Sequence, residues 1–329
     1  MTRLSVLDLA PIVQGGDAAQ ALANSLDLAR AAERLGYRRY WLAEHHNMPG
    51  VASAATSVVM AHVAAGTSTI RVGAGGVMLP NHAPLVIAEQ FGTLAALFPG
   101  RIDLGLGRAP GTDPRTAQAL RRNLSGGDDF PNDVVELLRY LGPEQPGQAV
   151  RAFPGVGSNV PVWILGSSTY GAQLAAMLGL PYAFASHFAP ADLDHALALY
   201  RARFQPSDYL DRPYVMVGAM VTAAETDAEA QFLASSMHQA FVNLRTGRAA
   251  PLPPPVEGYY GSLDEGAKGM IDHALSCAIV GGPETVKAKL DAFLARTGAD
   301  ELIAANQVFD HPKRIRSFEI LGEVGGLGA

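Results

Sequence analysis

Short, strongly apolar runs alternate with longer Ala- and Leu-rich runs along almost the whole chain. The short runs carry the β-branched and aromatic residues typical of buried strands, whereas the longer runs indicate helices. Strands are expected at 4–9, 37–43, 70–78, 101–107, 161–166, 181–186, 213–222 and 300–306. Helices are expected at 18–35, 54–66, 83–97, 130–141, 168–178, 190–204, 225–247 and 283–296, with a closing helix at 311–322.

Eight strands that are each followed by a helix predict a closed (β/α)8 barrel, the TIM barrel. The alternative is an open doubly wound sheet, which normally has fewer strands. Such a sheet often carries a nucleotide fingerprint, but GLGRAPG at 105–111 has the spacing GxGxxxG and lacks the expected following helix and acidic partner. Because composition does not shift along the chain, residues 1–329 are expected to form one domain.

Two long stretches interrupt the alternation. Residues 142–160 are rich in Gly and Pro, and residues 248–276 contain the run PLPPP. Loops of this length in a compact barrel are usually lids or surface segments, so the second is a candidate lid. The apolar run Cys277–Val280 that follows it is expected to form an accessory strand before a helix with Pro283 near its start.

Composition narrows the class of protein. Of the 329 residues, 48% are hydrophobic and 17% are charged, which excludes a disordered chain. The net charge of −6 without a basic run argues against nucleic acid or an anionic membrane as the main partner. Cys277 is the only cysteine, so no disulfide can form within the chain. No signal peptide or membrane span is recognised, and a cytoplasmic location is expected.

Acidic residues and histidines, which can take part in catalysis, follow several of the predicted strands directly. In a (β/α)8 barrel these positions share the face that carries the active site. Loops are polar in any protein, so some enrichment is expected without a site, but four of the nine histidines fall there. The candidates for the pocket are Asp8, Glu44, His45, His46, His82 and His187.

The turn Gly166–Thr169 joins the fifth predicted strand to a helix. Backbone N–H groups and hydroxyls converge there in the positive field of the helix N-terminus, which suits a phosphate. Helix capping is the alternative, but a cap needs one hydroxyl and this turn supplies three. Arg108, at the end of the neighbouring strand, could add a charge-assisted contact to the same phosphate. We therefore expect a phosphate site here.

His45 and His46 are adjacent on an extended segment, so their side chains point in opposite directions and do not chelate one metal ion by themselves. A metal is not expected; a single imidazole that faces the pocket as acid, base or hydrogen-bond donor fits better. The alternative is a histidine bonded to the loop backbone. Gly75-Gly76 inside a strand indicates either a bulge or the close approach of a flat ligand, and the pattern leaves both open.

WLAEHH at 41–46, together with the stretches 70–113 and 162–188, resembles the bacterial luciferase-like flavin monooxygenases. These motifs lie in the same order as in the family and on the predicted strand ends, so the resemblance is specific, and it covers most of the chain. It implies a (β/α)8 barrel that takes reduced FMN from a separate flavin reductase. With O2 the flavin would form a hydroperoxide that attacks a small, aldehyde-like substrate. A homodimer is expected by the same analogy.

The resemblance also implies roles for single residues. His45 matches the catalytic histidine of the family, and Gly75-Gly76 matches a non-proline cis peptide beside the flavin ring. The residues that match the phosphate site are Arg108, Ser167, Ser168, Tyr170 and Gly171.

The chain departs from the family pattern at two positions. Gly107 stands where light-emitting members can carry a reactive cysteine, so light emission is not implied, and Gly171 stands where relatives often have Ser or Thr. Two alternative functions also stay open. One is hydride transfer with a deazaflavin coenzyme on the same fold, and the other is a flavin-binding subunit without catalysis.

Overall fold

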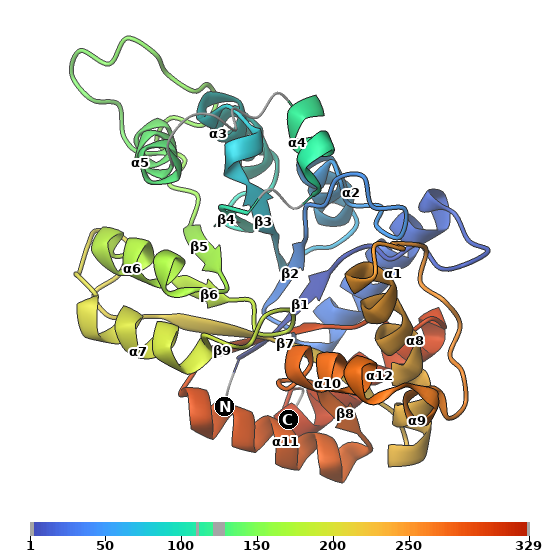
Figure 1. The fold of residues 1–329 in the computed structure, drawn as a ribbon. Coiled ribbons are helices and arrows are strands. Elements are labelled where there is room, and N and C mark those ends of the chain that lie inside the picture. Colours follow the sequence, from blue (N-terminus) through green and yellow to red (C-terminus); the bar gives the residue numbers. More distant parts are fainter. Residues whose placement is uncertain (1–2, 110–111, 121–128, 328–329) are drawn as a thin grey trace.

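The computed structural model describes residues 3–109, 112–120 and 129–327. Within them, eight parallel strands close into a barrel surrounded by helices (Figure 1). The barrel strands are β1 Arg3–Asp8, β2 Arg39–Leu42, β3 Arg71–Met78, β4 Ile102–Gly107, β5 Val162–Gly166, β6 Tyr182–Phe184, β7 Val215–Ala223 and β9 Glu301–Ala305. The ring is complete because β6 pairs with β7 and β9 pairs with both β1 and β7. The predicted barrel and all eight of its strands are confirmed.

The accessory strand predicted near 277–280 is β8 Ile279–Gly281. It pairs with the last three residues of β7, from Val221 to Ala223, whereas β9 pairs with the part of β7 before them. The strand therefore extends the sheet beside the barrel without entering the ring.

The helices of the described residues lie outside the barrel (Figure 1). They are α1 Ala18–Leu35, α2 Thr56–Ala65, α3 Pro84–Leu97, α4 Pro114–Ala119, α5 Phe130–Leu141, α6 Thr169–Leu178, α7 Leu193–Arg203, α8 Asp227–Arg245, α9 Tyr259–Ser262, α10 Glu265–Ala274, α11 Pro283–Thr297 and α12 His311–Gly325, with the short 3₁₀ helix η1 Leu79–Asn81. None of them is both long and apolar enough to cross a membrane.

The two long stretches differ in the structure. Residues 142–160 contain no helix or strand, as predicted, but the prediction of a loop over 248–276 is wrong in its second half, which contains α9 and α10. The first half is extended and is joined to the β1–α1 loop, because Leu252 exchanges backbone hydrogen bonds of 2.8 Å with Ile12 and Gln14. The buried side chain of Ile271 brings α10 into the apolar cluster that includes α8.

A buried charge network fills the barrel near the N-terminal ends of its strands. Arg39 forms ion pairs with Asp103 at 2.6 Å and with Glu301 at 2.9 Å, and Arg71 forms a further one with Asp103 at 2.6 Å. Trp41 donates its indole N–H to Asp103 at 3.2 Å. We assign this network to the structure of the barrel, because active sites in this fold lie at the opposite, C-terminal ends of the strands.

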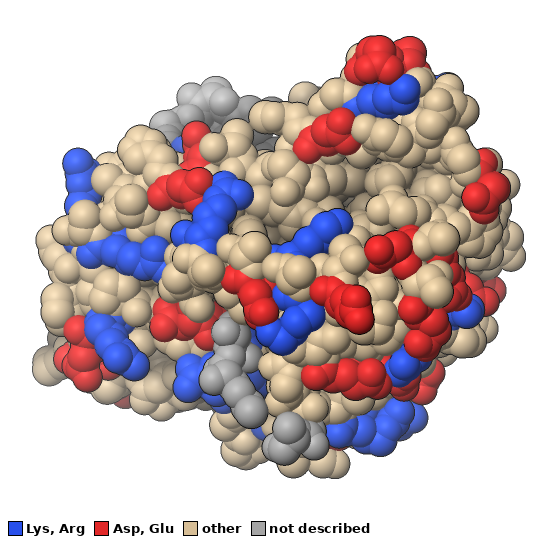
Figure 2. All heavy atoms as spheres, turned by 90° about the horizontal axis from the view of Figure 1, so that it is seen from below, with Lys and Arg blue, Asp and Glu red and all other residues tan. Residues whose placement is uncertain are grey.

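The surface seen from below in Figure 2 carries acidic and basic side chains in a mixed pattern. No continuous basic area is visible on that face. A nucleic acid would need such an area to hold its phosphates, so this face does not offer the expected footprint.

Candidate active site

Several predicted site residues meet where the strands end. Glu44, His45 and His46 follow β2, His82 follows η1 after β3, and His187 follows β6. Because all barrel strands are parallel, these ends lie on one face, where the loops of the fold build active sites.

Glu44, His46 and His82 form a single cluster. The Nε2 atoms of both imidazoles lie 2.8 Å from Oε1 of Glu44, and the backbone N–H of Met78 donates to Oε2 at 3.2 Å. Burial raises the pKa of Glu44, but the hydrogen bonds and charge of His82, together with His46 and Met78, outweigh it and hold the pKa below its usual value. The carboxylate is therefore ionised at neutral pH and acts only as an acceptor, so each Nε2 carries the proton.

His45 and His187 stand apart from this cluster. In the described part of the chain, the Nδ1 atom of each is buried without a hydrogen-bond partner. Burial lowers the pKa of His45, and burial together with the charge of His45 lowers the pKa of His187 to about 4. Both imidazoles are therefore neutral at neutral pH.

The glycine pair in β3 lies at an irregularity of the strand, which agrees with the bulge interpretation. The peptide bond between Gly75 and Gly76 is cis, and the pairing of β3 with β4 shifts register between Ala74 and Val77. A Cβ on Gly76 would lie 2.8 Å from the carbonyl oxygen of Gly105. The irregularity is thus present, and a side chain at Gly76 would require the backbone to move. Whether a flat ligand approaches here stays a prediction.

The two halves of the predicted phosphate site lie together. The guanidinium carbon of Arg108, just after β4, is 4.2 Å from the ring centre of Tyr170 in the first turn of α6. Ser168 precedes α6 as its N-cap, but its side chain makes no capping hydrogen bond. Capping therefore does not use the Ser168 hydroxyl, and the positive end of α6 faces the same region as Arg108.

Gly171 is buried near these residues, but space does not require a glycine there. A Cβ at this position would make only ordinary contacts, the nearest at 3.4 Å to the Tyr182 ring. Many relatives have Ser or Thr at this position. The glycine of this chain lacks their hydroxyl, and no steric reason requires the change.

Asp8 does not belong to the pocket that the sequence suggested. It is completely buried, and its carboxylate accepts hydrogen bonds from Tyr40, from Arg314 at 2.7 Å and from the backbone of Ala10 at 2.8 Å. Burial raises the pKa of Asp8, but the positive charge of Arg314 and the hydrogen bonds from Ser25, Tyr40 and Arg314 together outweigh it and leave the pKa below its usual value. Asp8 thus joins β1 to α12 and is not positioned to contact a substrate.

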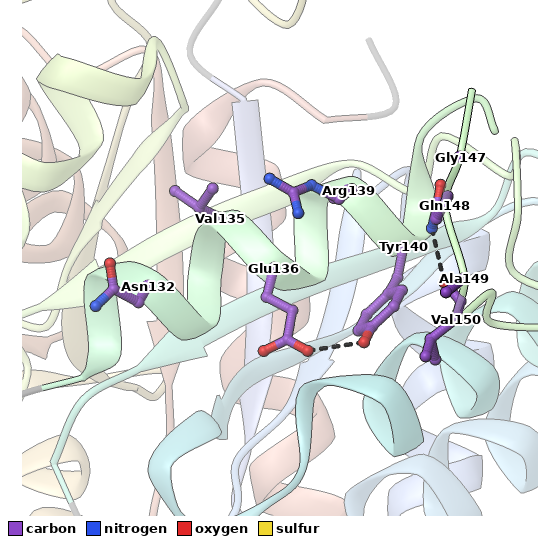
Figure 3. A pocket seen from close by; sticks show the side chains of 9 residues that line it. All are labelled: Asn132, Val135, Glu136, Arg139, Tyr140, Gly147, Gln148, Ala149 and Val150. Carbon is purple, nitrogen blue, oxygen red and sulfur yellow. Dashed lines mark hydrogen bonds between the residues drawn. The ribbon is translucent and has the colours of Figure 1, made fainter. Parts of the chain in front are cut away.

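A surface pocket lies elsewhere, between α5 and the segment 147–150 (Figure 3). Its volume is about 530 Å³, and one wall contains the hydrogen bond of 2.7 Å between Tyr140 and Glu136. The pocket is lined by Asn132, Val135, Glu136, Arg139, Tyr140, Gly147, Gln148, Ala149 and Val150. It includes none of the predicted site residues, so it is separate from the candidate active site.

Comparison with known proteins gives matches along almost the whole chain. Residues 2–301 match the family model described as luciferase-like monooxygenase. The Escherichia coli K12 protein named luciferase-like monooxygenase is 55% identical over 97% of this chain and 96% of its own length. The crystal structure of apo-MsnO8 superposes with a TM-score of 0.89 at 36% identity and covers 99% of both chains.

Two more distant structures share the fold. One is the oxygenating constituent of 3,6-diketocamphane monooxygenase from Pseudomonas putida in complex with FMN, with a TM-score of 0.74 at 17% identity over 98% of this chain and 97% of that one. The other is an F420-dependent secondary alcohol dehydrogenase, with a TM-score of 0.71 at 14% identity over 98% of both chains. At these identities the similarity concerns the barrel alone.

Proposed function

The chain belongs to the luciferase-like monooxygenase family, and from this premise we propose that it is a flavin-dependent monooxygenase that uses reduced FMN and O2 on a small, aldehyde-like organic substrate. It works in the cytoplasm as a homodimer and receives its reduced FMN from a separate flavin reductase. One domain carries the site, and residues 248–276 cover it as a lid.

The contact between Arg108 and Tyr170 is the observation that carries this proposal. It joins the end of β4 to the first turn of α6, where the Ser168 hydroxyl is not used as a cap. A guanidinium beside a helix N-terminus fits the terminal phosphate of FMN. The residues that would hold this phosphate are Arg108, Ser167, Ser168, Tyr170 and Gly171, and the Gly75-Gly76 backbone would lie beside the flavin ring.

Bound reduced FMN supplies the electrons with which O2 transfers one oxygen atom to the substrate. The chain contributes the proton chemistry. His45 is neutral and its Nδ1 has no hydrogen-bond partner among the residues that the structure describes, so it can accept or donate one proton near the reacting atoms.

A coupled assay tests this function. The purified chain is mixed with FMN, a flavin reductase, NADH and a panel of aldehydes, and carboxylic acid products and O2 consumption are measured. The reductase without this chain gives the background of flavin oxidation. We expect acid that depends on the chain, on FMN and on O2.

Two outcomes would contradict the proposal. Absence of any O2-dependent product across the panel would favour the flavin-binding subunit without catalysis. Tighter binding of a reduced deazaflavin than of reduced FMN would favour hydride transfer, the reaction class suggested by the F420-dependent neighbour.

A further inference from the structure

The cluster of Glu44, His46 and His82 has the donor set of a metal site. One carboxylate oxygen and two Nε2 atoms lie within 4.8 Å of one another. Two imidazoles and one carboxylate, with further positions open, suit divalent transition metals. The adjacency of His45 and His46 argues against chelation by that pair, but the structure joins His46 instead to His82, which lies on another strand end.

The two distances from Glu44 to the imidazoles need only a small adjustment to admit an ion. Each Nε2 is now 2.8 Å from Oε1 of Glu44. Bonds of about 2.0–2.1 Å to a tetrahedral Zn²⁺ separate ligand atoms by about 3.4 Å. Each imidazole would therefore move outward by roughly half an ångström, and its proton would shift to Nδ1 or be released.

The ligands are held by their surroundings. His82 caps η1, and its backbone N–H donates to Leu79 at 2.9 Å. The carbonyl of His46 accepts the Thr112 hydroxyl at 3.0 Å, and Met78 orients the Glu44 carboxylate through its backbone N–H. These contacts fix the backbone of His46 and His82 and the carboxylate of Glu44, and the hydrogen bonds to Glu44 direct the two imidazoles.

Charge and access also favour a cation. Among the described residues no lysine or arginine lies within ion-pair distance of Glu44, whose only ion-pair partners there are the two histidines. The Glu44 side chain is 3% exposed, whereas His46 is 16% and His82 is 28% exposed. An ion can therefore approach from the imidazole side and reach a buried negative charge.

We propose that Glu44, His46 and His82 form a binding site for one divalent transition metal ion of the Zn²⁺ class, with the fourth position open to water. The site uses none of the residues assigned to the FMN phosphate. It does not depend on the proposed monooxygenase function, because binding is measured without flavin.

Titration calorimetry with ZnCl2 on the metal-free full chain tests the site. We expect saturable binding of one ion per chain. His46→Gln and His82→Gln keep an N–H donor for Glu44, so the carboxylate stays satisfied while the metal ligand is lost. Each variant is expected to bind Zn²⁺ at least about tenfold more weakly than the unmodified chain.

His195→Ala is the matched control, since His195 is an exposed histidine on α7 and lies outside the cluster. This variant should bind as the unmodified chain does, and circular dichroism verifies that all variants are folded. Absence of saturable binding, or equal affinity in the unmodified chain and both Gln variants, would overturn the proposal.

Discussion

A Cβ atom on Gly218 would lie 2.3 Å from Nδ1 of His187. The imidazole from the end of β6 therefore occupies the space that a side chain on β7 would need. The two segments are also joined by the Ser186 hydroxyl, which donates to the carbonyl of Gly218 at 2.6 Å. The position of His187 thus depends on a glycine in a neighbouring strand.

Gly218→Ala should displace His187. We expect a loss of turnover together with destabilisation by about 1–3 kcal/mol, because the methyl group would overlap the buried edge of the His187 ring. Substrate turnover and urea unfolding measure the two effects. Gly269→Ala on α10 is the control, since a Cβ there meets no atom within 4 Å and should leave both quantities unchanged or slightly raise stability. Normal turnover in Gly218→Ala would contradict the dependence.

His187 should make the fold sensitive to acid. The pKa of His187 is about 4 in the folded state, against an ordinary value of 6.5. Between these two pH values the unfolded chain therefore binds a proton at His187 that the folded chain does not bind. Stability is full above pH 6.5 and falls as pH drops toward 4, by about 2 kcal/mol at pH 5. His187→Gln removes this contribution. Its unfolding free energy should therefore decrease less between pH 7 and pH 5, and an identical decrease would refute the assignment.

His45→Ala should lower turnover while FMN affinity stays within a few fold. The reason is that the neutral His45 imidazole handles a proton, whereas the phosphate contacts assigned to binding lie elsewhere. Single-turnover kinetics with reduced FMN and a fluorescence titration measure the two quantities separately. An unchanged rate in this variant would remove His45 from its assigned role.

The barrel could be predicted from the sequence because each of its strands is a short, buried apolar run. The segment 248–276 was harder. Its proline run is typical of a loop, and α10 contains Gly266 and Gly269, which lower helix propensity. Packing of Ile271 in the apolar cluster with α8 stabilises this helix, and such tertiary packing leaves little trace in the local pattern.

The candidate site was predictable at the level of strand ends but not of partners. Asp8 and Glu44 both lie at or just after the end of a strand, and the neighbouring sequence does not distinguish their roles. Asp8 meets Arg314, which is 306 positions away, whereas Glu44 meets His82. Gly218 gave only the weak signal of a glycine inside an apolar strand. The roles of Asp8, Glu44 and Gly218 depend on contacts with residues that are distant in the sequence. A single sequence does not show such contacts.

Arg108→Ala should weaken binding of FMN by about 10- to 100-fold and leave riboflavin binding unchanged. A charge-assisted hydrogen bond to phosphate contributes about 1.5–3 kcal/mol, and riboflavin has no phosphate. Equilibrium titration with both ligands gives the comparison. Arg139→Ala removes an exposed arginine from the pocket beside α5 and should change neither affinity. An equal loss for FMN and riboflavin would place the phosphate elsewhere.

Asp103→Asn should destabilise the fold far more than the loss of one surface charge. Asp103 is fully buried and neutralises both Arg39 and Arg71, so its replacement leaves two cations in the barrel without full compensation. Removing one partner of a buried ion pair costs about 3–5 kcal/mol.

Asp194→Asn is the matched comparison for this last prediction. Asp194 forms an ion pair of 2.8 Å with Arg296, but both side chains are exposed to solvent, and such pairs contribute about 0–1 kcal/mol. Urea unfolding of the two variants at the same ionic strength measures the difference. Equal destabilisation by both substitutions would mean that solvent screens the ion pairs of Asp103. The network would then not behave as a buried one.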